Sequence, residues 1–288
     1  MTAMRYIQIG YAINKYLDSI EKDQVDYCAV LSGYSALDGL TGGLEPGELI
    51  VIGGDPGIGK TVLALNLARN ASVDYNITSV YFSLEMSTAC LTRRLIAMEL
   101  GMPMKKLGSI EKLKTEERSQ IDNKLKILAN APLFIDDKVA LSTDQLRDRV
   151  KDLVNKEKAK LIIIDYVTLL SSEPPSNIEF RRLEQQNNLR RLKEIALSFN
   201  VVVVALTHIE WRHRKKGFGP VITDLTLFYP SVEDYADKII LLHRPSLYSG
   251  NAFMNERDIL EVRLVKNEKG SVGIVGLYFD CDTLKLSD

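Results

Sequence analysis

Short, continuously apolar runs alternate along this chain with longer stretches in which apolar residues recur every three or four positions. The short runs predict buried strands, and the longer stretches predict amphipathic helices. The predicted strands are 48–53, 78–84, 133–136, 161–165 and 201–206. The predicted helices are 61–68, 88–100, 113–131, 142–156 and 180–199. Apolar strands separated by helices indicate an α/β fold with a mostly parallel central sheet, flanked by helices on both faces.

The pattern changes towards the C-terminus. Three further strands, predicted at 238–243, 259–266 and 272–279, follow one another without helices between them. They predict antiparallel hairpins that complete the sheet at its C-terminal side. Glycines between Gly33 and Gly47 predict tight turns before the first strand. A chain of 288 residues is within reach of one large α/β domain.

Residues 1–30 show a separate pattern. Apolar residues from Met4 to Ile20 recur at loosely helical spacing, and charged residues gather from Asp18 to Asp26. We expect an amphipathic helical arm or linker there, and a single domain over 31–288. Periodicity alone does not decide whether this arm packs against its own domain or against a neighbouring subunit.

Composition excludes several classes of protein. The net charge is −1, so a nucleic-acid-binding surface must be local. Cys28, Cys90 and Cys281 are far apart, which indicates neither zinc nor a redox pair and suits a reducing compartment. No apolar run approaches the length of a membrane span, and the N-terminus has no signal-type apolar core. We therefore expect a cytoplasmic protein without a membrane partner.

The most informative motif is Gly54-Asp55-Pro56-Gly57-Ile58-Gly59-Lys60-Thr61, which fits the P-loop pattern between a predicted strand and a predicted helix. Backbone N–H groups of the loop and of the helix start at Val62 would converge on a phosphate. Lys60 would contact the β- and γ-phosphates, and the Thr61 hydroxyl would hold Mg²⁺. The motif predicts binding of ATP with Mg²⁺. The alternative is a glycine-rich turn that binds nothing.

Other polar residues end neighbouring strands, where open α/β sheets bind their ligands. Asp165 follows four apolar residues and matches the Walker B pattern, which holds Mg²⁺, usually through water. Tyr166 comes next, where many ring ATPases carry a glutamate that activates water. Glu85, after the second strand, is therefore the candidate catalytic base. A cap on the following helix is the alternative role for Glu85.

Several strings resemble the C-terminal motor domain of the DnaB replicative helicase family. They are residues 32–47, 82–87, 161–166 and 203–207. The resemblance covers about residues 31–283 and implies a RecA-like fold, hexameric rings, ATP sites between subunits and movement on single-stranded DNA. The P-loop string by itself equally resembles that of RadA-type relatives. We expect the family's N-terminal helical domain to be absent, with residues 1–30 in the place of its linker helix.

Two positions depart from the family pattern near the nucleotide. His208 stands where the family usually has a glutamine that senses the γ-phosphate, and histidine can also hydrogen-bond a phosphate. The arginine-finger string reads Lys266-Asn267-Glu268-Lys269-Gly270, so Lys266 and Lys269 are the remaining candidates to act from the adjacent subunit. A lysine cannot reproduce a bidentate guanidinium contact, which predicts slow hydrolysis.

The family's DNA-contact stretch reads Asp224-Leu225-Thr226-Leu227-Phe228-Tyr229-Pro230-Ser231 here and lacks its arginine. A basic segment precedes it, flanked by Trp211 and Phe218. Its candidate DNA-binding residues are Arg212, Arg214, Lys215 and Lys216. Such a loop could hold phosphates and stack bases of single-stranded DNA. A solvated surface loop is the alternative.

Arg244 and Tyr248 follow a predicted strand in the region that borders the nucleotide base in the family. The two side chains could sandwich adenine by stacking and cation–π contact, or they could belong to a surface turn. The sequence thus favours an ATP-dependent helicase or translocase that forms homo-oligomers. It leaves open an ATPase switch or recombination mediator whose ATP binding drives assembly without unwinding.

Overall fold

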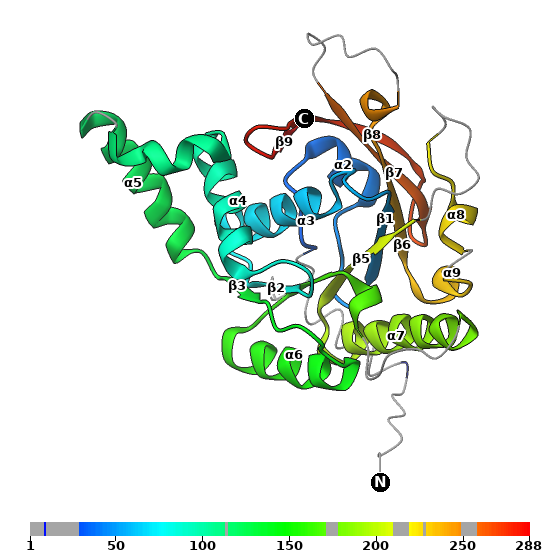
Figure 1. Ribbon diagram of the computed structural model, residues 1–288. Coiled ribbons are helices and arrows are strands. Elements are labelled where there is room, and N and C mark those ends of the chain that lie inside the picture. The colour runs from blue at the N-terminus through cyan, green and yellow to red at the C-terminus, as the bar shows by residue number, and fades with distance from the viewer. Residues whose placement is uncertain are drawn as a thin grey trace.

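The computed structural model describes Ile9 and residues 29–112, 115–170, 178–209, 219–226, 229–248 and 258–288. This part of the chain forms one nine-stranded sheet in the order β3-β2-β4-β5-β1-β6-β7-β8-β9. Helices cover both of its faces (Figure 1). The strand that precedes the P-loop, β1, lies between β5 and β6 in the middle of the sheet.

Six strands run parallel, and three continue the sheet in antiparallel pairing. The parallel strands are β1 (Leu49–Gly54), β2 (Ser79–Ser83), β3 (Leu133–Asp136), β4 (Leu161–Asp165), β5 (Val202–His208) and β6 (Lys238–His243). The antiparallel strands are β7 (Ile259–Asn267), β8 (Gly273–Asp280) and β9 (Lys285–Ser287).

Eight α-helices lie in the described part of residues 29–288. They are α2 (Ser35–Thr41), α3 (Lys60–Arg69), α4 (Thr88–Leu100), α5 (Thr115–Asn130), α6 (Thr143–Glu157), α7 (Ile178–Phe199), α8 (Ile222–Thr226) and α9 (Val232–Tyr235). A π-helical turn, Asn70–Asp74, extends α3, and 3₁₀ turns lie at Met104–Lys112, Val167–Leu169 and Pro245–Leu247.

The parallel strands are mostly apolar because each face of the sheet packs against helices. Ile50 and Ile52 of β1 belong to the core layer beneath α3 and α4. Leu49 and Val51 of the same strand belong to the layer beneath α6 and α7. Side chains alternate between the two faces of a strand, so both sets of positions must be apolar in a covered sheet. This arrangement confirms the predicted α/β architecture.

Helix boundaries follow local capping signals. The Ser87 hydroxyl accepts a hydrogen bond from the Cys90 N–H at the start of α4, and Gly101 ends the helix with φ of 62°. Ser142 and Gln145 form a reciprocal capping box at the start of α6. The five predicted helices agree with the structure to within two residues at every end.

Three features differ from the sequence-based expectation. Residues 35–41, expected as tight turns, form α2, and the Asp38 carboxylate accepts the Ser32 N–H at 2.7 Å before the helix begins. The β6 strand pairs in parallel with β1, so the antiparallel hairpins begin only at β7. The three-residue strand β9 was not predicted, because so short a segment carries no periodicity.

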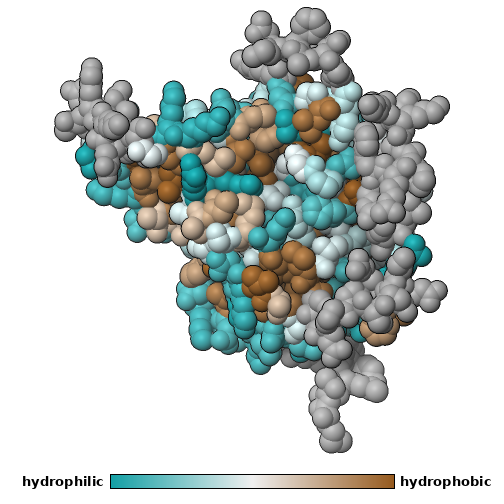
Figure 2. Space-filling model, viewed as in Figure 1, coloured by the Kyte–Doolittle hydropathy of each residue, from teal (hydrophilic) through white to brown (hydrophobic). Residues whose placement is uncertain are grey.

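No helix in the described ranges is both long and apolar enough to cross a membrane. On the face drawn in Figure 2, apolar side chains form separate patches among hydrophilic ones. The predicted arm at 1–30 lies almost entirely outside the described residues and stays a prediction.

Candidate functional site

Strand pairing brings the predicted site residues to one edge of the sheet. Gly54, at the end of β1, is paired with His208 at the end of β5. Ser83, at the end of β2, is paired with Asp165 at the end of β4. The P-loop, Glu85, Asp165 and His208 therefore all lie where the parallel strands end, as the sequence predicted.

Lys60 is the centre of the P-loop. Its side chain is only 2% exposed, and its ammonium donates hydrogen bonds to the carbonyl oxygens of Gly54 at 2.7 Å and Asp55 at 2.8 Å. Burial lowers the pKa of Lys60 to about 8, while the negative charges of Asp165, Asp55 and Glu85 act in the opposite direction. The loop therefore folds around the buried Lys60 ammonium, whose positive charge can neutralise the negative charge of a triphosphate.

Glycine is required in the P-loop for two reasons. Gly57 and Gly59 have φ of 75° and 119°, which residues with a Cβ rarely adopt. At Gly54, an added Cβ would lie 2.8 Å from Cγ2 of Ile58. These positions let the backbone fold closely around the Lys60 ammonium.

Thr61 and Asp165 are in direct contact. The Thr61 hydroxyl donates to Oδ2 of Asp165 at 3.0 Å, and the Tyr81 hydroxyl donates to the same oxygen at 2.6 Å. The other oxygen, Oδ1, is buried and has no hydrogen-bond partner among the described residues. Burial raises the pKa of the Asp165 carboxyl, although both hydroxyls and Lys60 act to lower it.

This pair fits a magnesium ion bound with a nucleotide. Mg²⁺ prefers hard oxygen ligands, keeps several waters and is usually held by one or two side chains together with phosphates. A hydroxyl beside a carboxylate with an unpaired buried oxygen supplies such a set. No group of three or more histidine, cysteine, aspartate or glutamate residues in the described part of the chain could bind a metal by itself.

Tyr166 lies among the other groups of the site. Its ring centroid is 4.1 Å from that of His208 and 5.4 Å from the Lys60 ammonium. Its hydroxyl lies 3.3 Å from the Thr61 hydroxyl. Burial and the Asp165 charge raise the pKa of Tyr166 to about 12. The phenol therefore stays protonated and links three predicted site residues.

His208 is neutral in this environment. Burial and the positive charge of Lys60 lower its pKa to about 4. Its Nδ1 atom is buried without a hydrogen-bond partner in the described structure. A neutral imidazole can donate one hydrogen bond and accept another, which suits contact with a phosphate.

Glu85 is exposed and lies two residues beyond the end of β2. Its negative charge raises the pKa values of Lys60, Asp165 and Tyr166. The alternative role, capping of α4, is filled by Ser87. The charge of Glu85 therefore acts on three groups of the phosphate-binding site.

The two predicted base-binding residues have partners within the protein. The Tyr248 hydroxyl donates to Oδ2 of Asp55 in the P-loop at 2.8 Å. Arg244 is buried, forms an ion pair with Asp258, and lies with its guanidinium carbon 4.4 Å from the Phe279 ring centroid. Sequence reasoning missed Phe279 and Asp258, because only strand pairing brings β7 and β8 beside the P-loop.

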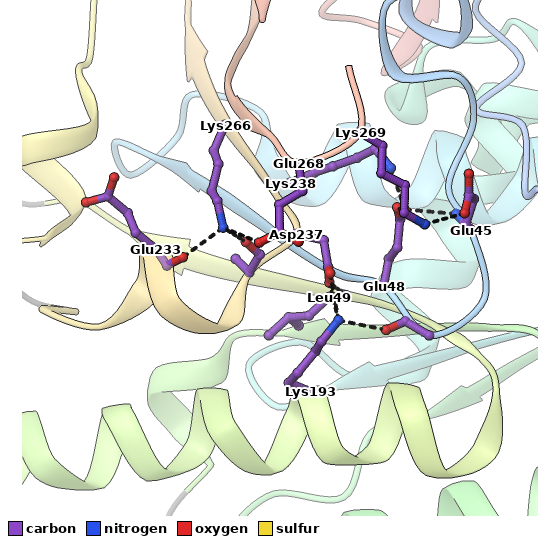
Figure 3. Close-up of polar contacts among 12 residues, drawn as sticks. Glu45, Glu48, Leu49, Lys193, Glu233, Asp237, Lys238, Lys266, Glu268 and Lys269 are labelled. Carbon is purple, nitrogen blue, oxygen red and sulfur yellow. Dashed lines mark hydrogen bonds and ion pairs between the residues drawn. The ribbon is translucent and has the colours of Figure 1, made fainter. Parts of the chain in front are cut away.

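Lys266 and Lys269 lie at the opposite edge of the sheet. Lys266 is paired with Ile239 near the start of β6, which runs parallel to β1, whereas the P-loop follows the end of β1. Figure 3 shows both lysines held by their own chain. Lys266 donates to the carbonyl oxygens of Glu233 and Ala236 at 2.7 and 2.6 Å and pairs with Glu268 at 2.8 Å.

Lys269 pairs with Glu45 and lies 3.5 Å from Glu48, which in turn pairs with the buried Lys238 (Figure 3). Neither Lys266 nor Lys269 is therefore part of the P-loop site of its own subunit. A role for either lysine in hydrolysis would require a second copy of the chain.

The basic residues Arg212, Arg214, Lys215 and Lys216 lie outside the described residues, and their predicted DNA contact stays a prediction. Within the following stretch, Tyr229 is only 2% exposed and accepts a hydrogen bond from Thr207 at 2.5 Å. Tyr229 is therefore a core residue that contacts β5.

Residues 29–288 match the family model described as the DnaB-like helicase C terminal domain. The chain belongs to this family. It is 36% identical over 266 residues to a probable replicative DNA helicase of Trieres chinensis, covering 89% of this chain and 56% of that protein. It is 30% identical over 252 residues to the replicative DNA helicase DnaB of Geobacillus stearothermophilus, covering 86% and 54%. The chain thus spans little more than half the length of these curated relatives.

Solved structures agree with the family assignment. One structure, described as an ATPase domain, superposes with a TM-score of 0.85 at 25% identity, covering 99% of both chains. A DnaB-like replicative helicase, studied for its interactions with primase, gives 0.83 at 26% identity, covering 98% of this chain and 68% of that one. The predicted RecA-like fold of DnaB type is confirmed.

Proposed function

We propose that this chain is the ATP-hydrolysing motor of a DNA helicase or translocase of DnaB type, which moves on single-stranded DNA. The proposal depends on the buried Lys60 ammonium lying beside the Thr61–Asp165 pair. The ammonium has the opposite charge to a triphosphate, and the Asp165 carboxylate has the opposite charge to Mg²⁺. Family membership supports the same reading. A cytoplasmic location is consistent with it.

In this proposal, catalysis is mainly positioning and electrostatics. Residues 54–62 surround the phosphates with backbone N–H groups, and Lys60 neutralises charge on the β- and γ-phosphates. Thr61 and Asp165 would hold Mg²⁺, which would offset phosphate charge. Glu85 accepts a proton from the attacking water, and the neutral His208 contacts the γ-phosphate. Arg244 and Tyr248 border the base. The guanidinium of Arg244 also lies against the ring of Phe279.

We further propose that the active form is a homo-oligomer, with a hexameric ring as the expected arrangement. Lys266 and Lys269 lie at the edge of the sheet opposite the P-loop, so a head-to-tail assembly would bring them towards the nucleotide of a neighbour. Arg212, Arg214, Lys215 and Lys216 would contact single-stranded DNA.

One observation favours a second function, a switch in which ATP binding drives assembly and hydrolysis is slow. Glu268 stands in the place of the family's arginine, and the Lys266 ammonium already has three acceptors within its own chain. A lysine ammonium held by three acceptors in its own chain is less able to contact and stabilise a phosphate of a neighbouring subunit.

ATPase rates with and without single-stranded DNA, measured beside the particle mass with and without nucleotide, test both functions. A motor should hydrolyse ATP faster on DNA, and a switch should assemble with ATP but turn over slowly whether or not DNA is present. Lys60→Met should weaken ATP binding at least about 10-fold, because it removes a charged donor. ATP binding by Lys60→Met with the same affinity as the wild type would overturn the site assignment.

A further inference from the structure

Tyr81 is a fully buried tyrosine whose hydroxyl reaches the edge of the nucleotide site. It lies in the middle of β2, is 0% exposed, and is paired in register with Ile163 of β4. Asp165 lies two residues further along β4, a distance of about 7 Å at the usual rise of a strand. A tyrosine side chain is about this long, so its hydroxyl meets the carboxylate at 2.6 Å.

The two donors to Asp165 share one of its oxygens. Thr61 and Tyr81 both donate to Oδ2, at 3.0 and 2.6 Å, while Oδ1 is buried without a partner among the described residues. A carboxylate held by two hydroxyls at one oxygen has a defined rotation about its Cβ–Cγ bond. Thr61 alone would leave that rotation less restricted.

We propose that Tyr81 is a positioning residue for magnesium: it holds Oδ2 of Asp165 so that Oδ1 is the oxygen presented to the hydrated ion of the bound nucleotide. Groups that orient a metal-binding side chain from behind affect metal affinity by about 10- to 100-fold. Tyr81 does not touch the nucleotide and acts only through Asp165. The inference rests on the proposed function, since it concerns the ion that accompanies ATP.

The test is a binding measurement that needs no turnover. Affinity for a fluorescent ATP analogue is measured in EDTA and over a Mg²⁺ titration, for the wild type and for Tyr81→Phe. We expect equal affinity in EDTA, because Lys60 and the loop are unchanged, and a half-saturating Mg²⁺ concentration about 10-fold higher in the variant. Tyr34→Phe, in another buried tyrosine of the same core layer, should follow the wild-type curve.

A double-mutant cycle separates positioning from packing. In the Asp165→Asn background, Tyr81→Phe should no longer change the Mg²⁺ dependence. Two results would overturn the role of Tyr81: a Mg²⁺ curve identical to the wild type, or an equal loss of affinity in EDTA and in Mg²⁺. A wild-type protein that binds the analogue no better with Mg²⁺ than in EDTA would instead contradict the proposed function.

Discussion

The ring of Tyr166 lies against the ring of His208, with 4.1 Å between their centroids and an angle of 41° between their planes. This contact packs an aromatic surface against the imidazole that stands where the family usually has glutamine. It also contributes to the burial that keeps His208 neutral. In the proposed site, His208 would therefore act as an uncharged polar group.

The first prediction concerns the pH dependence of stability. The pKa of His208 is about 4 in the folded protein and about 6.5 when it is unfolded, so the unfolded chain binds more protons between these values. The contribution of His208 to stability should be complete above pH 6.5 and should decline as the pH falls towards 4. Urea denaturation should show that, as the pH falls from 6.5 to 4, the free energy of unfolding of the wild type decreases relative to that of His208→Gln. A pH-independent difference would contradict a half-buried imidazole that is neutral in the folded protein.

The second prediction separates the two roles considered for Glu85. Glu85→Gln should retain ATP binding but lower the hydrolysis rate by about 100-fold or more, because a general base typically contributes that much. Ser87→Ala is the matched control, since it removes the cap of α4 and should cost about 1 kcal/mol of stability while leaving the rate unchanged. Wild-type turnover by Glu85→Gln would exclude it as the base.

The third prediction addresses the missing arginine. Glu268→Arg should raise the ATPase rate of the assembled protein by at least about 10-fold, since an arginine acting from a neighbour is worth far more than this in related chemistry. Glu268→Gln controls for the loss of the Lys266–Glu268 contact alone. The rate should not change at protein concentrations where only monomers are present. Equal rates for the arginine and glutamine variants in the assembled state would indicate that this position does not reach the neighbouring phosphate.

The fourth prediction concerns the buried ion pair of Lys238 and Glu48, whose side chains are 2% and 3% exposed. Lys238→Met should lower the free energy of unfolding by about 3–5 kcal/mol, because it leaves a carboxylate buried without its main partner. The double variant Glu48→Leu with Lys238→Met should recover much of this loss. Urea denaturation of the three proteins measures the effect, and a single variant as stable as the wild type would show that Lys269 compensates for the loss of Lys238.

Local signals in the sequence determined the helices, the strands and the P-loop of this protein. The P-loop, the apolar strands and the capped helices depend on residues a few positions apart, so periodicity and cap chemistry located them. The positions of Asp165 and His208 at strand ends were also sufficient to predict their meeting beside Lys60, because parallel strands end at one edge of a sheet.

Only the tertiary structure decided the contacts that depend on strand order. Tyr81 and Asp165 are 84 positions apart and meet because β2 and β4 are neighbours. Arg244 lies against Phe279, and Lys266 lies at the edge opposite the P-loop, because β7 pairs with β6 and β8 pairs with β7. A hydrogen bond or a ring contact needs atoms within a few ångströms, and no spacing along the chain specifies which distant strands become neighbours.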